Sequence, residues 1–260
     1  MLTLYFSGTG NTRFVADNFS KKTDAECHSI EEDLDFGAAI ARHERICFSY
    51  PIYGSCVPRI MEDFVRRHRS ALIGKEFVIL CTQLLFSGDG ARAFTDLLKG
   101  VDHRVVYAAH INMPNNICNV PILPVAGPER IEKYKRNALT ALDRISDDLR
   151  RGVVHRKGFN PFSMLLGLLT QRLYFRSVMP HARKSVRVSP ACNLCLQCVR
   201  ACPVQNLKAE SGRIVPKDNC TLCYRCVNLC PQKAITVLVH GKVRRQYKGI
   251  VDRSDARRYN

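Results

Sequence analysis

Residues 192–231 read CNLCLQCVRACPVQNLKAESGRIVPKDNCTLCYRCVNLCP and contain one pattern, C-x2-C-x2-C-x3-C-P, twice at an offset of 28 residues. The eight cysteines are Cys192, Cys195, Cys198 and Cys202 in the first copy, and Cys220, Cys223, Cys226 and Cys230 in the second. Three cysteines at steps of three can face one metal cluster from a tight loop, whereas the fourth begins the next element and points away. We therefore expect the fourth thiolate of each copy to serve the cluster of the other copy.

Two other uses of paired cysteines suit this stretch less well. Structural zinc sites pair two C-x2-C knuckles and need neither the third cysteine nor the proline. Disulfide frameworks are typical of small secreted domains, and the run from Met1 to Phe6 leads into a glycine loop without the features of a signal peptide. The stretch from about residue 185 to 239 instead resembles bacterial ferredoxins with two 4Fe-4S clusters. That resemblance implies one cluster on Cys192, Cys195, Cys198 and Cys230, and a second on Cys202, Cys220, Cys223 and Cys226.

Composition predicts one sizeable domain and one small domain, because the chain has 260 residues of which 46% are apolar. Residues 1–150 carry 19 Lys or Arg and 19 Asp or Glu, whereas residues 151–260 carry 21 and 4, so the whole net charge of +17 lies in the second part. The sequence contains no run of 18 consecutive apolar residues, so no membrane-spanning helix is predicted. The cysteines outside the repeats are interpreted as packing thiols in a reducing cytoplasm: Cys27, Cys47, Cys56, Cys81 and Cys118.

A glycine-rich loop follows the first apolar run. Residues 2–6, LTLYF, are typical of a buried strand, and they are followed at once by SGTGNT at residues 7–12 and by a helical run from residue 13. Unpaired backbone N–H groups and the helix dipole make such a loop an anion site. The loop lacks the lysine of a Walker P-loop and the third glycine of a dinucleotide fingerprint. Its three hydroxyl side chains suit a terminal phosphate monoester.

The runs that follow predict an α/β fold. Short apolar runs at 25–30, 45–50, 77–82 and 104–111 alternate with amphipathic stretches at 59–68, 91–99 and 129–151. This alternation predicts a doubly wound parallel sheet with helices on both faces, whose ligands bind at the carboxyl ends of the strands.

The first 150 residues resemble flavodoxins, and the resemblance implies that the loop at residues 7–12 holds the phosphate of FMN. The phosphate contacts would then be Ser7, Gly8, Thr9, Gly10, Asn11 and Thr12. The ring would lie between the loops after the third and fourth strands, which offer Pro51, Tyr53, Gly54, Phe86 and Gly88. Because the chain has no tryptophan, Tyr53 and Phe86 are the candidates for stacking on the flavin.

A basic linker at residues 151–184 contains a predicted helix, with apolar residues at helical spacing: Phe162, Leu165, Leu166, Leu169 and Leu173. We interpret this helix as docking the ferredoxin domain onto the flavodoxin-like domain, and an anionic membrane surface is the alternative. Residues 212–215 and 234–237 are predicted strands of the small α+β ferredoxin-like domain. The basic tail beyond residue 239 is expected to be mobile.

The whole chain resembles the flavodoxin and ferredoxin fusion proteins of anaerobic bacteria. The expected organisation is an FMN domain at 1–150, a linker at 151–184, a ferredoxin domain at 185–240 and a tail at 241–260. The resemblance implies single-electron transfer between the clusters and FMN, linking a low-potential donor to an acceptor. The basic half predicts an acidic redox partner.

Two other functions stay open from the sequence. A flavin-dependent reductase of a small substrate would need a pocket with an acid or base, for which Asp89, His103 and His110 are candidates. A nucleic-acid binder is suggested only by the basic second half, and it would leave the glycine loop without a purpose.

Overall fold

The computed structural model describes residues 1–120 and 122–250. It divides into two compact units that interleave along the chain. The first contains Met1–Ser7, Asn11–Met113 and Glu132–Phe175, and the second contains Gly8–Gly10, Pro114–Ile131 and the residues from Arg176 onward. The predicted boundaries, which follow one another along the chain, stay a prediction.

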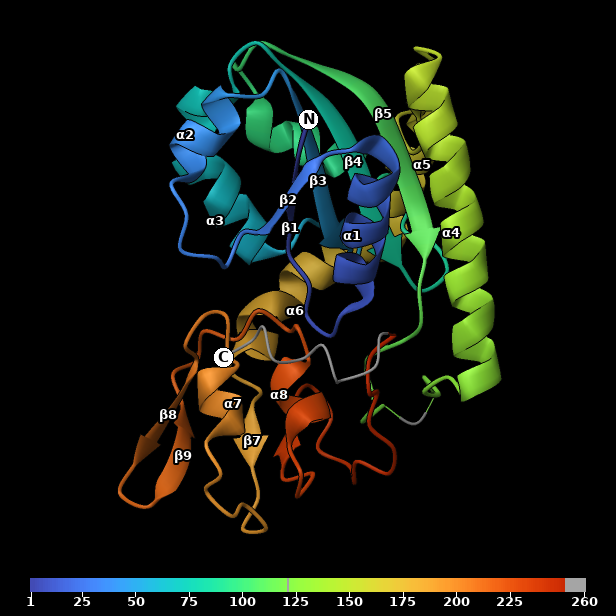
Figure 1. Cartoon of the computed structure of the whole chain (residues 1–260). Helices are drawn as coiled ribbons and strands as arrows, with labels where there is room; N and C mark the ends of the chain where they lie inside the picture. The colour runs from blue at the N-terminus through green and yellow to red at the C-terminus, as the bar shows by residue number, and fades with distance from the viewer. Residues whose placement is uncertain (121, 251–260) are drawn as a thin grey trace. The chain divides into compact units, whose positions relative to one another are not determined.

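Six parallel strands form the centre of the first unit (Figure 1). They are β1 (Leu2–Tyr5), β2 (Glu26–Ser29), β3 (Arg45–Pro51), β4 (Lys75–Gln83), β5 (His103–Asn112) and β6 (His155–Arg156). Their order is β2-β1-β3-β4-β5-β6, so the chain turns back at β1 and the loops after β1, β3 and β4 leave the same edge of the sheet. The predicted doubly wound sheet is confirmed, and the short β6 was not predicted.

Helices cover both faces of this sheet, with α1 and α4 on one side and α2 and α3 on the other (Figure 1). Their bounds are α1 (Asn11–Thr23), α2 (Phe36–Ala41), α3 (Arg59–Arg67) and α4 (Pro128–Arg150), with a 3-10 turn η1 (Arg69–Leu72) after α3. The predicted helix at 91–99 is a 3-10 segment, η2 (Arg92–Leu98), and the Phe94 ring lies 4.7 Å from the ring of Phe48 in the core. The predicted strands and helices are therefore present, and the glycine loop lies at the carboxyl edge of the sheet.

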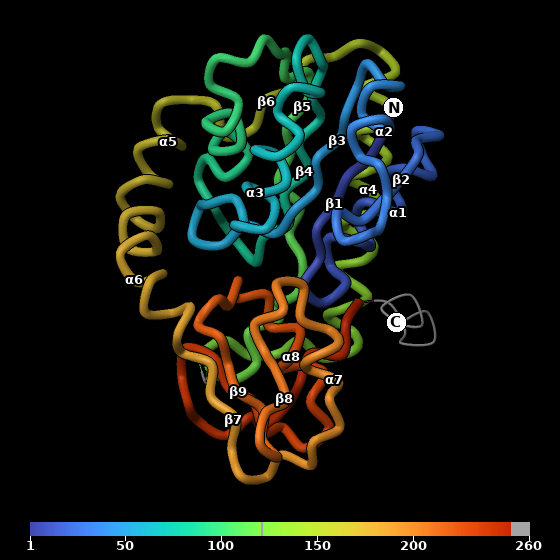
Figure 2. Tube along the Cα trace, turned by 90° about the vertical axis from the view of Figure 1, so that its left-hand side faces the viewer, coloured from blue at the N-terminus to red at the C-terminus, as the bar shows by residue number. Residues whose placement is uncertain are grey.

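A bent helix follows β6 and comprises α5 (Pro161–Gly167), the π-helical η3 (Leu168–Arg172) and α6 (Leu173–Arg183), together called the linker helix (Figure 2). It begins where the side chain of Asn160 accepts a hydrogen bond from the Ser163 N–H at 2.8 Å. A π turn brings residues five apart onto one side, so Gly167 and Arg172 face the same way, and both are buried. Its predicted docking face lies on the other side and is exposed, apart from half-buried Leu166.

The second unit contains short elements only: β7 (Arg187–Val188), α7 (Gln197–Arg200), β8 (Leu207–Glu210), β9 (Arg213–Pro216), α8 (Arg225–Leu229) and β10 (Ile235–Thr236). Strand β10 pairs with β7, and β8 pairs with β9, both antiparallel. The predicted strands at 212–215 and 234–237 are therefore present but belong to different two-stranded sheets.

The prediction of a mobile tail is wrong for residues 241–250, whereas residues 251–260 lie outside the described part. The side chains of Val243, Tyr247 and Ile250 are at most 2% exposed. The backbone N–H of Tyr247 donates to Asn228 Oδ1 at 2.7 Å, and Gln246 Nε2 donates to the carbonyls of Val227 and Cys230. Three buried apolar side chains thus fix a segment whose overall composition is polar and basic.

No helix within residues 1–120 and 122–250 is long and apolar enough to cross a membrane.

Candidate redox centres

The two cysteine repeats adopt the same backbone. In each copy, the residues on either side of the second cysteine and a third residue two positions after the proline have positive φ angles between 47° and 60°. These residues are Leu194, Leu196 and Gln205 in the first copy, and Leu222, Tyr224 and Lys233 in the second. A residue with a Cβ in this conformation costs about 1–2 kcal/mol, so the surroundings must compensate for it.

The first set of cysteines gathers around Cys198. The pKa of the Cys198 thiol is raised to about 11, first by burial and then by the nearby thiols of Cys230, Cys192 and Cys195. The fourth cysteine of the second copy thus lies with the first three of the first copy.

The second set gathers around Cys226. Burial raises the pKa of this thiol well above its usual value, followed by the effects of Cys223, Cys220, Cys202 and, least, Cys198. Cys202, Cys220, Cys223 and Cys226 also line one small cavity. The ligation of these cysteines in two crossed sets stays a prediction.

Backbone N–H groups donate to sulfur in both sets. Asn206 donates to Cys202 Sγ at 3.1 Å, Leu222 to Cys220 Sγ at 3.3 Å, and Ala234 to Cys230 Sγ at 3.3 Å. Such bonds stabilise the thiolate form and influence the reduction potential of a cluster. Within the described ranges no three ligating side chains meet closely enough for a single metal ion.

The cysteine loops of the two copies differ in their exposure to solvent. Leu194 of the first copy is 41% exposed, whereas the equivalent Leu222 is 5% exposed. Residues 221–225 are all buried. The first set therefore lies under a loop that solvent reaches, and the second lies under a covered loop.

Gly8–Gly10, which belong to the second unit, help to cover the second loop. A Cβ at Gly8 would collide with the carbonyl of Cys223. Arg225 Nε donates to the Gly8 carbonyl at 3.2 Å, and Asn116 Nδ2 donates to Thr9 Oγ1 at 3.1 Å and to the Cys223 carbonyl at 3.4 Å. Part of the predicted phosphate loop is thus packed against a predicted cluster loop. The sequence reasoning missed Asn116 and Arg225.

The phosphate end of the predicted FMN site has a suitable cradle. Gly10 has a φ of +99°, and no atom lies within 4 Å of the place where its Cβ would be. The 13-residue helix α1 begins at Asn11 with no acidic residue in its first turn. Ser7 and Thr12 are 2% and 1% exposed, and Thr12 Oγ1 lies 2.8 Å from Thr82 Oγ1. A helix N-terminus with hydroxyl groups suits a phosphate, and FMN binding at this loop stays a prediction.

The two loops predicted to hold the flavin ring, called the ring loops, follow β3 and β4 and contact the linker helix. A Cβ on Gly54 would collide with the ring of Phe175, and a Cβ on Gly88 would lie 2.6 Å from Gly167 Cα. Phe86 is 50% exposed, and Tyr53 is half-buried. The close approach that both glycines permit is therefore made by the linker helix, and contact of these loops with a flavin ring stays a prediction.

A buried ion pair joins the helix to these loops. Arg172, 5% exposed, pairs with Asp89, which is fully buried. Its guanidinium also donates twice to the Ser55 carbonyl, at 3.2 and 3.1 Å. Arg92 Nε binds the other oxygen of Asp89 at 2.7 Å. The sequence predicted that Arg172 lies on the exposed polar surface of this helix, and that prediction is wrong because the side chain pairs with buried Asp89.

The polar residues considered for a reductase have structural partners. Asp89 is held by two arginines. Burial lowers the pKa of His110 to about 4, and His110 Nε2 accepts a hydrogen bond from the Ala91 N–H. His103 lies at the opposite end of β5, with Nδ1 2.7 Å from the Val101 carbonyl. His103 therefore lies away from Asp89 and His110.

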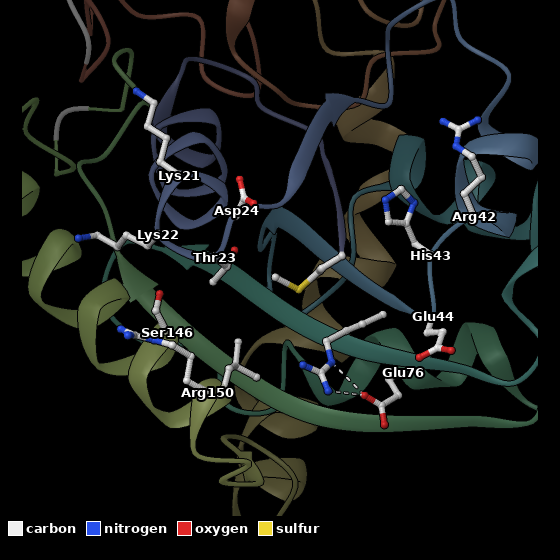
Figure 3. Close-up of a pocket in the computed structure, with 13 residues that line it drawn as sticks. Lys21, Lys22, Thr23, Asp24, Arg42, His43, Glu44, Glu76, Ser146 and Arg150 are labelled. Carbon is white, nitrogen blue, oxygen red and sulfur yellow. Dashed lines mark hydrogen bonds and ion pairs between the residues drawn. The ribbon is translucent and has the colours of Figure 1, made fainter.

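A hollow of about 720 Å³ lies at the other edge of the sheet, beside Met1, Arg45 and Glu76 at the amino ends of strands (Figure 3). Its lining mixes cations such as Lys21 and Arg42 with the carboxylates of Asp24, Glu44 and Glu76. None of the predicted cofactor residues lines it.

The parallel sheet with its loop at the carboxyl edge, together with the cysteine repeats, defines a redox protein with a flavodoxin-like and an iron-sulfur part. Residues 2–113 match the flavodoxin domain model, and residues 214–236 match the 4Fe-4S binding domain model. The chain is thus a flavodoxin/ferredoxin fusion that carries FMN and at least one 4Fe-4S cluster and acts in electron transfer.

Among solved structures, the chain is similar to two-electron reduced flavodoxin from Megasphaera elsdenii, with 21% identity over 55% of this chain and 98% of that chain and a TM-score of 0.38. It is also similar to oxidised flavodoxin 2 from Bacillus cereus, with 18% identity over 57% and 97% and a TM-score of 0.40. The Trp repressor binding protein from Bacillus subtilis matches with 15% identity over 55% and 96% and a TM-score of 0.41. No curated protein matches the chain significantly.

Proposed function

We propose that this protein passes single electrons between two 4Fe-4S clusters and FMN, and so links a low-potential donor to an acceptor. The proposal is supported by the repeated backbone of the two cysteine repeats, and by the thiols near Cys198 and Cys226 that crossed ligation would require. The first set is Cys192, Cys195, Cys198 and Cys230, and the second is Cys202, Cys220, Cys223 and Cys226. When bound, the clusters exchange one electron at a time and FMN exchanges one or two.

The first set is proposed as the point of exchange with a partner protein. Its loop is exposed at Leu194, so a partner can approach the cysteines closely. Residues 221–225 in the loop of the second set are buried, so a partner can approach those cysteines less closely. A route from outside would therefore enter at the first set and continue to the second.

FMN is proposed to bind with its phosphate at residues 7–12. The backbone N–H groups at the start of α1 and the hydroxyls of Ser7, Thr9 and Thr12 supply donors, and no carboxylate in the first turn opposes the phosphate charge. The ring is proposed to lie at the loops of Pro51, Tyr53, Gly54, Phe86 and Gly88.

The partner is proposed to be an acidic redox protein, in a reducing cytoplasm. The formal charge of +17 falls to about +11 when roughly −4 for the two ligated clusters and −2 for the phosphate are added. Residues 1–150 are neutral, so the excess surrounds the second part of the chain. Such a charge accelerates association with an acidic partner more than it strengthens the final complex.

The number of clusters tests this function directly. Protein purified without oxygen should contain about eight iron and eight sulfide ions per chain. Cys195→Ser and Cys223→Ser should each leave about four, whereas Cys118→Ser, which changes a cysteine outside the repeats, should leave about eight. About four irons in the unaltered protein would contradict the proposal.

Crossed ligation has a separate signature. Cys202→Ser should alter the same electron paramagnetic resonance signal of the reduced protein as Cys223→Ser, although Cys202 belongs to the first copy. Cys230→Ser should alter the same signal as Cys195→Ser. If each fourth cysteine affected the signal of its own copy, the ligand sets would be local to each repeat.

A further inference from the structure

Bulky apolar side chains are exposed along the linker helix. Five of them are between 52% and 73% exposed and form what we call the apolar stripe: Phe162, Leu165, Leu169, Leu173 and Tyr174. Met164 and Leu168 beside them are 38% and 36% exposed. All seven lie within residues 162–174. A concentration of this kind on a soluble surface marks an interaction site rather than scattered exposed residues.

The structure fixes the direction in which the stripe faces. The buried ion pair between Arg172 and Asp89, and the hydrogen bond from Gln171 Nε2 to the Phe86 carbonyl at 3.1 Å, hold the polar face of the helix against the first unit. In a regular α-helix Arg172 would lie next to the apolar residues, whereas the π turn at Leu168–Arg172 moves it to the side of Gly167. The helix therefore buries an arginine and exposes its leucines, apart from half-buried Leu166.

The charges around the stripe have one sign. Residues 151–184 contain seven Lys or Arg and no Asp or Glu. Four exposed cations, which form no ion pair with a carboxylate in the described part of the chain, lie before and after the stripe in the sequence: Arg156, Lys157, Arg176 and Lys184. An apolar stripe between cations, without a carboxylate, is complementary to a lipid surface with anionic headgroups.

We propose that the apolar stripe binds the surface of an anionic lipid bilayer, with the linker helix in the plane of the interface. The leucines and aromatic rings would enter the boundary between headgroups and acyl chains, and the flanking cations would contact the headgroups. A second copy of the chain is a poorer occupant, because stripe-to-stripe pairing would bring two carboxylate-free basic segments together. This proposal does not depend on the direction of electron flow.

Vesicle binding by the full-length, cofactor-loaded protein tests the proposal. We expect flotation with vesicles of phosphatidylcholine and phosphatidylglycerol at a ratio of about 2:1, and at least about tenfold weaker binding to pure phosphatidylcholine. Leu165→Gln with Leu169→Gln should weaken binding to the anionic vesicles by about 30-fold, because two partly inserted leucines are lost. Ile73→Gln is the matched control, since Ile73 is 60% exposed outside the stripe, and its binding should not change.

A second readout uses the absence of tryptophan from the chain. Leu169→Trp creates a single reporter whose emission should shift to the blue when anionic vesicles are added, whereas Ile73→Trp should not respond. Absence of wild-type binding, or equal binding by the double variant, would overturn the proposal. An emission already blue-shifted without vesicles would mean that protein covers the stripe. Dissociation of a dimer by the double variant in light scattering would instead identify a second copy as the occupant.

Discussion

Replacing Arg172 by alanine should release the linker helix from the ring loops. The variant would leave the buried Asp89 with Arg92 as its partner, so the loss is smaller than the 3–5 kcal/mol typical of a wholly unpaired buried charge. It would also remove two hydrogen bonds to the Ser55 carbonyl, a buried acceptor worth about 1–3 kcal/mol when unsatisfied. We expect a total of about 3 kcal/mol, which corresponds to about a 100-fold increase in the equilibrium constant for local opening.

Hydrogen–deuterium exchange of the full-length protein, read by mass spectrometry over residues 161–175, measures this opening. Arg172→Ala should accelerate exchange of these amides by about 100-fold, and Arg176→Ala, one turn further along the same helix and exposed, by less than about threefold. Combining Arg172→Ala with Asp89→Asn should cost less than the sum of the single changes, because the two residues share one interaction. An acceleration below about threefold for Arg172→Ala would refute the assignment of the ion pair as the anchor of the helix.

Three further predictions follow from the other sites. Thr9→Val with Thr12→Val should weaken FMN binding far more than riboflavin binding, because only FMN has a phosphate, and equal losses in a fluorescence titration would exclude the phosphate contact. Tyr247→Ala should destabilise the second unit by about 3–5 kcal/mol because the ring is 1% exposed, whereas Lys248→Ala should change the unfolding midpoint in urea little. Burial lowers the pKa of His110 to about 4, so its contribution to folding stability is complete above the unfolded value of 6.5 and decreases as the pH falls. Amide exchange in β5 should therefore indicate about 2 kcal/mol less stability at pH 5 than at pH 7. His110→Gln should lack this part of the change.

The sheet could be predicted because its strands are short apolar runs that need both faces covered. Each predicted strand from 25–30 to 104–111 lies within two residues of an observed strand. Strand β6 could not be predicted, since His155 and Arg156 are polar and join the edge of the sheet by pairing with Tyr107 and Ala108. The region 91–99 has a helical pattern, but sequence periodicity does not distinguish a 3-10 segment from an α-helix over so few turns.

Two features of the sites depend on contacts between residues far apart in sequence. The face of the linker helix that packs is set by the ion pair between Arg172 and Asp89, 83 positions apart, which outweighs the apolar pattern. The tail is fixed by Val243, Tyr247 and Ile250, whose spacing of four and three residues was a signal hidden by the basic composition around it. In neither case could local composition reveal the distant residues that the segment contacts.

The backbone of the repeats bears on the number of clusters. The 4Fe-4S domain model covers residues 214–236, which include the second copy and not the first. Yet the first copy has a left-handed backbone conformation at the same three positions as the second. This conformation costs roughly 3–6 kcal/mol per copy. A loop with Leu194 and Leu196 exposed or half-buried gains too little from packing to offset that cost. Metal–thiolate bonds in the first copy would offset that cost. The equal conformation of both copies therefore favours a cluster in the first as well as in the second.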